Sequence, residues 1–159
     1  MFDLVNGLPI HPLVVHAVVV LLPLACLGTI ALVVRPAWRR PYGLLVVADA
    51  ALSAVLIPVA TSSGEALESH VGEPGAHAEL GEQLLWFALP LLVLSAALVW
   101  LDRRPVTRRG ASSPRVVQVV AVLALVAAVA ASVQVYRVGD SGARAAWADQ
   151  VTGSAQGGE

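Results

Sequence analysis

The sequence has few charged residues and almost no sulfur. Only 13% of its 159 residues are charged, well below the roughly 25% of soluble domains, whereas 57% are hydrophobic and the mean hydropathy is +0.76. The single cysteine, Cys26, excludes an intrachain disulfide and a thiolate metal cluster. Met1 is the only methionine, which argues against a Cu(I) site. The composition therefore indicates an integral membrane protein without a sulfur-based centre.

Four apolar runs are long enough to cross a hydrocarbon core, which requires about 20 helical residues. They cover residues 12–34, 43–61, 84–101 and 116–136. No Lys or Arg precedes the first run, unlike in a secretory signal peptide, so we expect this run to remain as a span. The sequence thus predicts an all-α protein with one four-helix transmembrane domain over residues 1–150 and a flexible tail over residues 151–159.

Arginine is distributed unequally between the segments that connect these runs. Eight of the ten basic residues lie in segments 35–42 and 102–115, whereas segment 62–83 contains five glutamates and no basic residue. Because arginine-rich loops remain in the cytoplasm, we expect a multi-pass protein of the bacterial cytoplasmic membrane with both termini outside. The second and third helices are expected to extend beyond the lipid as an outer hairpin. Nothing in this pattern indicates a nucleic-acid partner.

All four histidines, His11, His16, His70 and His77, fall on the predicted outer side. His11 lies at the entrance of the first helix, and His16 follows about 7.5 Å deeper on the helical rise. His70 and His77 flank the turn Gly-Glu-Pro-Gly, which brings them near each other. An imidazole where water is scarce requires a hydrogen-bond partner or a ligand, so we predict that these residues form one cluster.

Two kinds of ligand suit such a cluster. One is a b-type haem held by two histidines from different helices, and the other is a divalent metal ion held by imidazoles and carboxylates. The motif Cys-x-x-Cys-His is absent, which excludes c-type haem. For haem, His16 and His77 are the preferred axial pair, and Arg137 and Arg144 are the expected partners of the propionates. For a metal ion, all four histidines are candidate ligands.

A haem at one face cannot carry electrons across about 30 Å of hydrocarbon. A redox role would therefore consist of electron exchange at the outer face, with a quinol or an extracytoplasmic partner. Whether the protein is an enzyme stays open. Two other functions also stay open: a cofactor-free accessory or assembly subunit, and a module that senses pH through its imidazoles.

One ionisable residue lies within a predicted span. Asp49 is roughly 9 Å inside the second run on the helical rise. An ionisable group at this depth indicates a functional role by default. We favour the interpretation that Asp49 has a structural role and pairs with a residue at the same depth, such as Arg39, Arg40 or Gln118.

The fourth run is rich in small residues, among them Ala128 and Ala131. Small residues in a span predict close helix packing, here in the bundle interior, with a homodimer as the alternative. After this run we expect the helix to break at Gly139 and to resume as a short helix capped by Asp140 or Ser141.

Four motifs flank the runs: LPIHPLVVH opens the first, SSGEAL follows the second, HAELGEQ opens the third and YRVGDSGARAAW follows the fourth. On these motifs the chain resembles the small bacterial membrane proteins catalogued as domain of unknown function 2231. The resemblance implies a four-helix membrane fold and no established activity. Some relatives look as though they are joined to cytochrome-like segments, and this association favours the redox interpretation. Where this family commonly has a histidine, the chain has Asp140, whose carboxylate is a candidate partner of a histidine.

Overall fold

The computed structural model describes residues 4–5, 8–71, 75–104 and 113–156. In these residues two short strands, β1 (Leu4–Val5) and β2 (Leu8–Pro9), pair antiparallel before the first helix. The helices are α1 (Ile10–Val34), α2 (Arg39–Val71), α3 (Ala76–Arg103) and α4 (Pro114–Gln156), with one 3-10 turn, η1 (Pro36–Trp38), between α1 and α2. The predicted all-α architecture is confirmed, and the short strand pair is an addition that the sequence patterns did not indicate.

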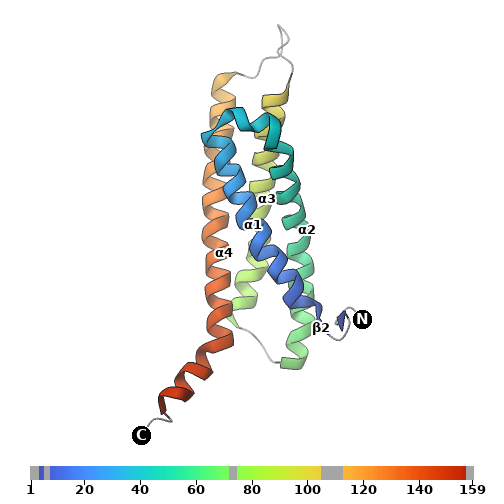
Figure 1. The fold of residues 1–159 in the computed structure, drawn as a ribbon, viewed down its shortest axis with the longest axis vertical. Helices are drawn as coiled ribbons and strands as arrows, with labels where there is room; N and C mark the ends of the chain where they lie inside the picture. Colours follow the sequence, from blue (N-terminus) through green and yellow to red (C-terminus); the bar gives the residue numbers. More distant parts are fainter. Residues whose placement is uncertain (1–3, 6–7, 72–74, 105–112, 157–159) are drawn as a thin grey trace.

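The helices form an antiparallel bundle (Figure 1). Both α1 and α3 pack against α2 and α4, so α1 and α3 are diagonal partners with little contact. Figure 1 shows the starts of α1 and α3 and the last turns of α2 and α4 at one end of the bundle, and the other helix ends at the opposite end. We call the first the histidine end, because it contains His11 and His77, and the second the arginine end, because it contains Arg39 and Arg40.

The outside of the bundle is apolar. Each of α1 to α4 contains a stretch that is long and apolar enough to span a membrane. Large aliphatic side chains point outward and remain uncovered by protein, with exposed fractions of 64% for Val20, 64% for Leu27, 63% for Val55 and 62% for Val93. Acyl chains cover such a surface at no cost, whereas water does not. The predicted four-span membrane protein is therefore confirmed.

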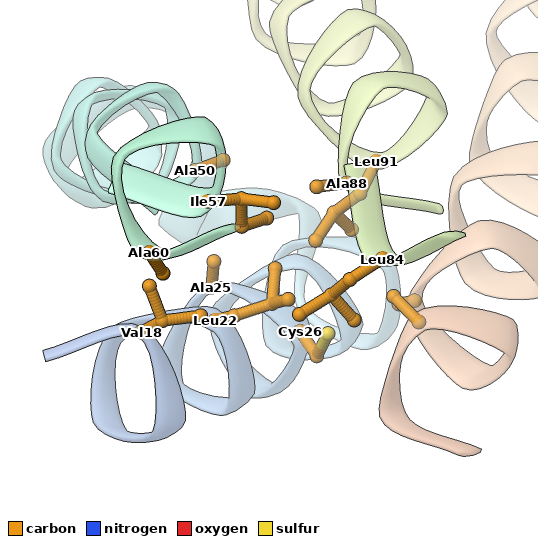
Figure 2. Close-up of a cluster of buried hydrophobic side chains, with 12 residues drawn as sticks. Val18, Leu22, Ala25, Cys26, Ala50, Ile57, Ala60, Leu84, Ala88 and Leu91 are labelled. Atoms are coloured by element: carbon orange, nitrogen blue, oxygen red, sulfur yellow. The ribbon is translucent and has the colours of Figure 1, made fainter. Parts of the chain in front are cut away.

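The interior is filled by small residues and a few larger aliphatic ones. Figure 2 shows Leu22 of α1, Ile57 of α2 and Leu91 of α3 converging in one cluster. Ala128 and Ala131 of α4 belong to the same cluster and are completely buried. Side chains of this size let helix backbones approach closely, which supports helix association in lipid. Ala128 and Ala131 of the fourth run thus lie in the bundle interior, as predicted, whereas Ser132 is exposed.

The predicted break at Gly139 is wrong, because α4 is continuous as far as Gln156. The two residues expected to cap a new helix make contacts inside the continuing one. Asp140 pairs with Arg144 one turn later, with 3.0 Å between Oδ2 and Nε, and the Ser141 hydroxyl donates to the carbonyl of Val138 at 2.8 Å. A helical glycine costs only about 1 kcal/mol, which does not end a helix that packs along its length.

Ion pairs join α2 to α3 at the arginine end. The Asp102 carboxylate lies 3.7 Å from Nη1 of Arg39 and 3.6 Å from Nε of Arg40. Arg39 is buried and also donates from Nε to the carbonyl of Leu32 at 2.9 Å. The partners predicted for Asp49 are wrong for its buried Oδ1, because Arg39 and Arg40 pair with Asp102 and Gln118 makes no hydrogen bond to this atom. The buried Oδ1 of Asp49 has no hydrogen-bond partner within the described ranges.

Candidate functional site

A pocket of about 170 Å³ lies between the helices at the histidine end. All four helices contribute to its wall, which is mainly aliphatic: Val15, Val18, Ile57, Leu84, Val135 and Val138. Two imidazoles, those of His11 and His77, line the same pocket from the diagonal helices α1 and α3. The carboxylates of Glu65 and Glu82 are among its remaining polar groups. The fold therefore brings two of the four predicted histidines together around one cavity.

His11 lies in the first turn of α1, and its ring contacts α2. Nδ1 of His11 is 2.9 Å from the carbonyl oxygen of Ala60 and 3.2 Å from Oγ of Ser63. A carbonyl oxygen can only accept a hydrogen bond, so Nδ1 carries the proton and donates it. In the neutral ring Nε2 then keeps its lone pair. The contact with α2 thus fixes which nitrogen of His11 is available to a ligand.

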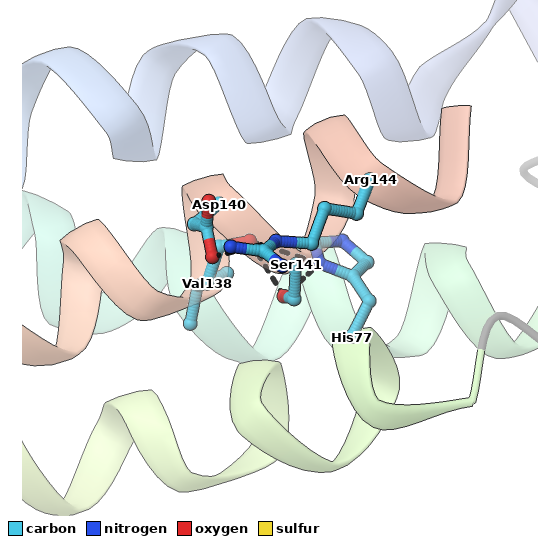
Figure 3. A network of polar contacts seen from close by, with 5 residues as sticks. All are labelled: His77, Val138, Asp140, Ser141 and Arg144. Carbon is cyan, nitrogen blue, oxygen red and sulfur yellow. Dashed lines mark hydrogen bonds and ion pairs between the residues drawn. The ribbon is translucent and has the colours of Figure 1, made fainter. Parts of the chain in front are cut away.

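His77 makes the corresponding contact between α3 and α4 (Figure 3). Its Nδ1 is 3.1 Å from the carbonyl oxygen of Val138 and 3.2 Å from Oγ of Ser141. By the same reasoning Nδ1 donates the proton and Nε2 keeps its lone pair. A hydrogen bond from Nδ1 to a carbonyl is the usual outer contact of a ligating histidine, because it orients the ring and raises its basicity.

One of the other two histidines, His16, is not part of this arrangement. His16 is exposed on α1, its Nδ1 contacts the carbonyl of Pro12 in the preceding turn, and it does not line the pocket. The reason is helical geometry, because five residues separate two side chains by about 140° around the axis. With His11 facing the pocket, His16 faces outward. The backbone of His70 belongs to α2, but its side chain lies outside the described part of the structure.

Neither arginine expected to meet the propionates lines the pocket. Both are exposed on α4 at the histidine end. Arg144 pairs with Asp140, and Figure 3 shows this pair next to the contact between His77 and Ser141. Nη1 of Arg137 lies 3.5 Å from Oε1 of Gln134. The two guanidinium groups thus belong to the same end as the pocket without forming its wall.

The donor set of the pocket favours one class of ligand. Among the described residues, no three side chains of His, Cys, Asp or Glu form a group that could hold a metal ion. A protein-bound zinc ion takes three or four protein ligands, whereas the iron of a b-type haem takes two axial imidazoles and receives its other ligands from the porphyrin. Two free Nε2 atoms therefore match haem more closely than a bare divalent ion.

Sequence reasoning missed the groups that hold the two rings in place. Hydroxyl and carbonyl contacts across helices leave no spacing pattern around a histidine. A signal was nevertheless present, because the dipeptide Ser-Gly occurs after both the second and the fourth run, as Ser63–Gly64 and Ser141–Gly142.

The comparisons with known proteins agree with the resemblance seen in the motifs. The family model described as "Predicted membrane protein (DUF2231)" matches residues 7–155, which include all four membrane spans. No curated protein and no solved structure matches the chain significantly.

Proposed function

This chain belongs to the DUF2231 family of predicted membrane proteins, and we propose that it binds a b-type haem between His11 and His77. The observation that carries the proposal is the pair of imidazoles, which face one pocket and each donate Nδ1–H to a backbone carbonyl of the neighbouring helix. Two neutral rings in this tautomer would hold the iron through their Nε2 lone pairs.

The surroundings of the two rings also suit haem. The pocket wall is mainly aliphatic, which would give a bound haem an environment of low dielectric. Small residues line the pocket, Ala60 on α2 and Ala78 and Gly81 on α3, and a Cβ at position 81 would meet nothing within 4 Å. When bound, the haem supplies one-electron redox chemistry. The protein contributes the two axial ligands, their orientation and the low dielectric environment.

Electron transfer at one membrane face follows from this location. The arginine distribution supports an orientation with the arginine end in the cytoplasm and both termini outside, in the bacterial cytoplasmic membrane. The described helices carry no histidine at the arginine end that would ligate a second haem. The partner is therefore a quinol in the outer leaflet or an extracytoplasmic redox protein. Arg137 and Arg144 are exposed at this end and would be the cationic partners of the propionates.

An absorption spectrum of the full chain tests the proposal. The protein would be expressed in haem-replete cells, purified in detergent, and measured oxidised and reduced with a pyridine haemochrome assay. We expect a Soret band and the narrow visible bands of low-spin, bis-imidazole haem b. Replacing His11 or His77 by Ala should remove them, whereas His16→Ala is the matched control and should retain them.

Three results would overturn the proposal. One is a wild-type protein that holds no haem, even after reconstitution with hemin, which would favour an accessory subunit or a pH-sensing module. Another is a loss of the spectrum in His16→Ala with retention in His11→Ala, which would restore the axial pair expected from the sequence. The third is stoichiometric divalent metal in place of haem by elemental analysis.

A further inference from the structure

The two histidines are held by the same set of groups in two different hairpins. In the α1–α2 hairpin, His11 contacts the carbonyl of Ala60, the hydroxyl of Ser63 and the backbone of Gly64. We call these four residues the first half-site. In the α3–α4 hairpin the same order is formed by His77, Val138, Ser141 and Gly142, the second half-site. In each, the carbonyl precedes the serine by three residues and the glycine by four.

The serine hydroxyls are committed to one orientation. Oγ of Ser63 donates to the carbonyl of Ala60 at 2.9 Å, and Oγ of Ser141 donates to the carbonyl of Val138 at 2.8 Å. Because each hydroxyl proton is used in this way, only lone pairs of Oγ face the imidazole. Nδ1 therefore meets two acceptors, a carbonyl and a hydroxyl oxygen, and in the tautomer with the proton on Nε2 the lone pair of Nδ1 would face both oxygens. The serine thus reinforces the choice made by the carbonyl.

The glycines provide the space in which the rings lie. A Cβ at position 64 would lie 3.0 Å from Cε1 of His11, and a Cβ at position 142 would lie 3.0 Å from Cε1 of His77. Each ring therefore packs directly on the backbone of the partner helix. An added methyl group would push the ring away from its acceptors by a few tenths of an ångström. Gly139 differs, because a Cβ there would meet nothing within 4 Å.

We propose that Ser63 with Gly64 and Ser141 with Gly142 are two equivalent pairs of positioning residues, which hold His11 and His77 in the Nδ1-protonated form with Nε2 free. The inference rests on the proposed haem site for its redox consequence, and on the hydrogen bonds alone for the tautomer. Neither pair touches the iron. Both act through the histidine, and each hairpin supplies one complete half-site.

Matched variants of the haem-loaded protein test the redox consequence. Gly64→Ala and Gly142→Ala should convert most of the low-spin haem to a high-spin form in electron paramagnetic resonance, whereas Gly139→Ala should not. Ser63→Ala and Ser141→Ala should shift the midpoint potential, and replacement by Thr should restore it because the hydroxyl returns. Ser132→Ala is the control, since this serine donates to the carbonyl of Ala128 in its own helix and does not line the pocket.

The tautomer is measured without haem. Long-range nitrogen–proton correlation spectra of ¹⁵N-histidine-labelled apoprotein, above the titration range of imidazole, should show Nδ1–H for His11 and His77. Ser63→Ala and Ser141→Ala should increase exchange with the other tautomer at the altered half-site only. If the wild-type protein binds haem but the glycine and serine variants behave like their controls, this inference is overturned and the proposed function stays intact. An Nδ1–H tautomer in a protein that binds no haem would overturn the proposed function and leave the positioning role intact.

Discussion

The two ends of the bundle use polar groups in opposite ways. At the arginine end Asp102 pairs with Arg39 and Arg40, and Nε of Arg39 donates to a backbone carbonyl. At the histidine end each imidazole uses one nitrogen for a carbonyl and a hydroxyl and leaves the other free beside a pocket. The carboxylate of Asp102 thus already has its partners at the arginine end, whereas Nε2 of each imidazole at the histidine end can still bind a ligand. We therefore expect variants at the arginine end to affect stability, and variants at the histidine end to affect ligand binding.

The largest effect should come from His77→Ala combined with His11→Ala. Removing both axial ligands should abolish haem binding, whereas the apoprotein should unfold at nearly the same denaturant concentration as the wild-type apoprotein. Each ring makes hydrogen bonds worth only about 1 kcal/mol net. The haem-to-protein ratio and unfolding in increasing sodium dodecyl sulfate measure the two quantities. A double variant that fails to insert or fold would contradict the separation between the two ends.

Arg39→Ala should give the reverse result. This buried side chain donates to the carbonyl of Leu32 and pairs with Asp102, so its removal leaves a buried acceptor and a carboxylate with a weaker partner. We expect a loss of about 3 kcal/mol in the free energy of unfolding and an unchanged haem spectrum. Arg40→Ala is the control, because that exposed side chain should contribute less than about 1 kcal/mol. Equal losses in the two variants would show that burial of Arg39 is unimportant.

Gly43→Ala should destabilise the same end by a smaller amount. A Cβ at position 43 would lie 2.6 Å from Cγ2 of Val99, so α2 and α3 would have to separate or Val99 would have to change rotamer. Overpacking of this kind costs about 1–3 kcal/mol. Gly139→Ala adds the same methyl group where there is open space and should be neutral or slightly stabilising. Thermal unfolding in detergent, monitored by circular dichroism, compares the two variants. If Gly43→Ala is as stable as the wild type, the contact between α2 and α3 at Val99 is loose.

Asp49→Asn should have the smallest effect. The buried Oδ1 of Asp49 has no partner in the described structure, so a neutral amide of the same shape loses no ion pair and removes the cost of a charge in the bilayer. The free energy of unfolding should stay the same or rise by up to about 1 kcal/mol. Asp102→Asn is the control and should be destabilising, because it weakens the ion pairs of Asp102 with two arginines. A clear loss of stability in Asp49→Asn would reveal a partner for this carboxyl in the bilayer.

Much of the fold could be predicted from the sequence, because the transfer of apolar side chains into lipid contributes most to its formation. That transfer depends on the length and composition of a run and not on its neighbours. The predicted break at Gly139 was wrong because the course of α4 there depends on packing with its neighbours. Local signals indicated a turn, whereas packing of α3 on α4, including the contact between His77 and Gly142, continues past that residue.

The sequence predicted at which end of the bundle the histidines lie, but not which of them face the pocket. Collecting the histidines at one end required only the count of spans, which the sequence contains. The choice between His11 and His16 depended on the rotation of α1 about its axis, and that rotation is set by contacts with α2 and α4.

The sequence by itself determined four membrane-spanning helices, two chemically distinct ends and the gathering of all histidines at one of them, since composition and alternation of runs are sufficient for these. Only the tertiary structure decided which imidazoles share a pocket and which nitrogen of each stays free. Those properties arise from hydrogen bonds between residues far apart in the chain, Ala60 and Ser63 with His11 and Val138 and Ser141 with His77. No local pattern around either histidine contains that information.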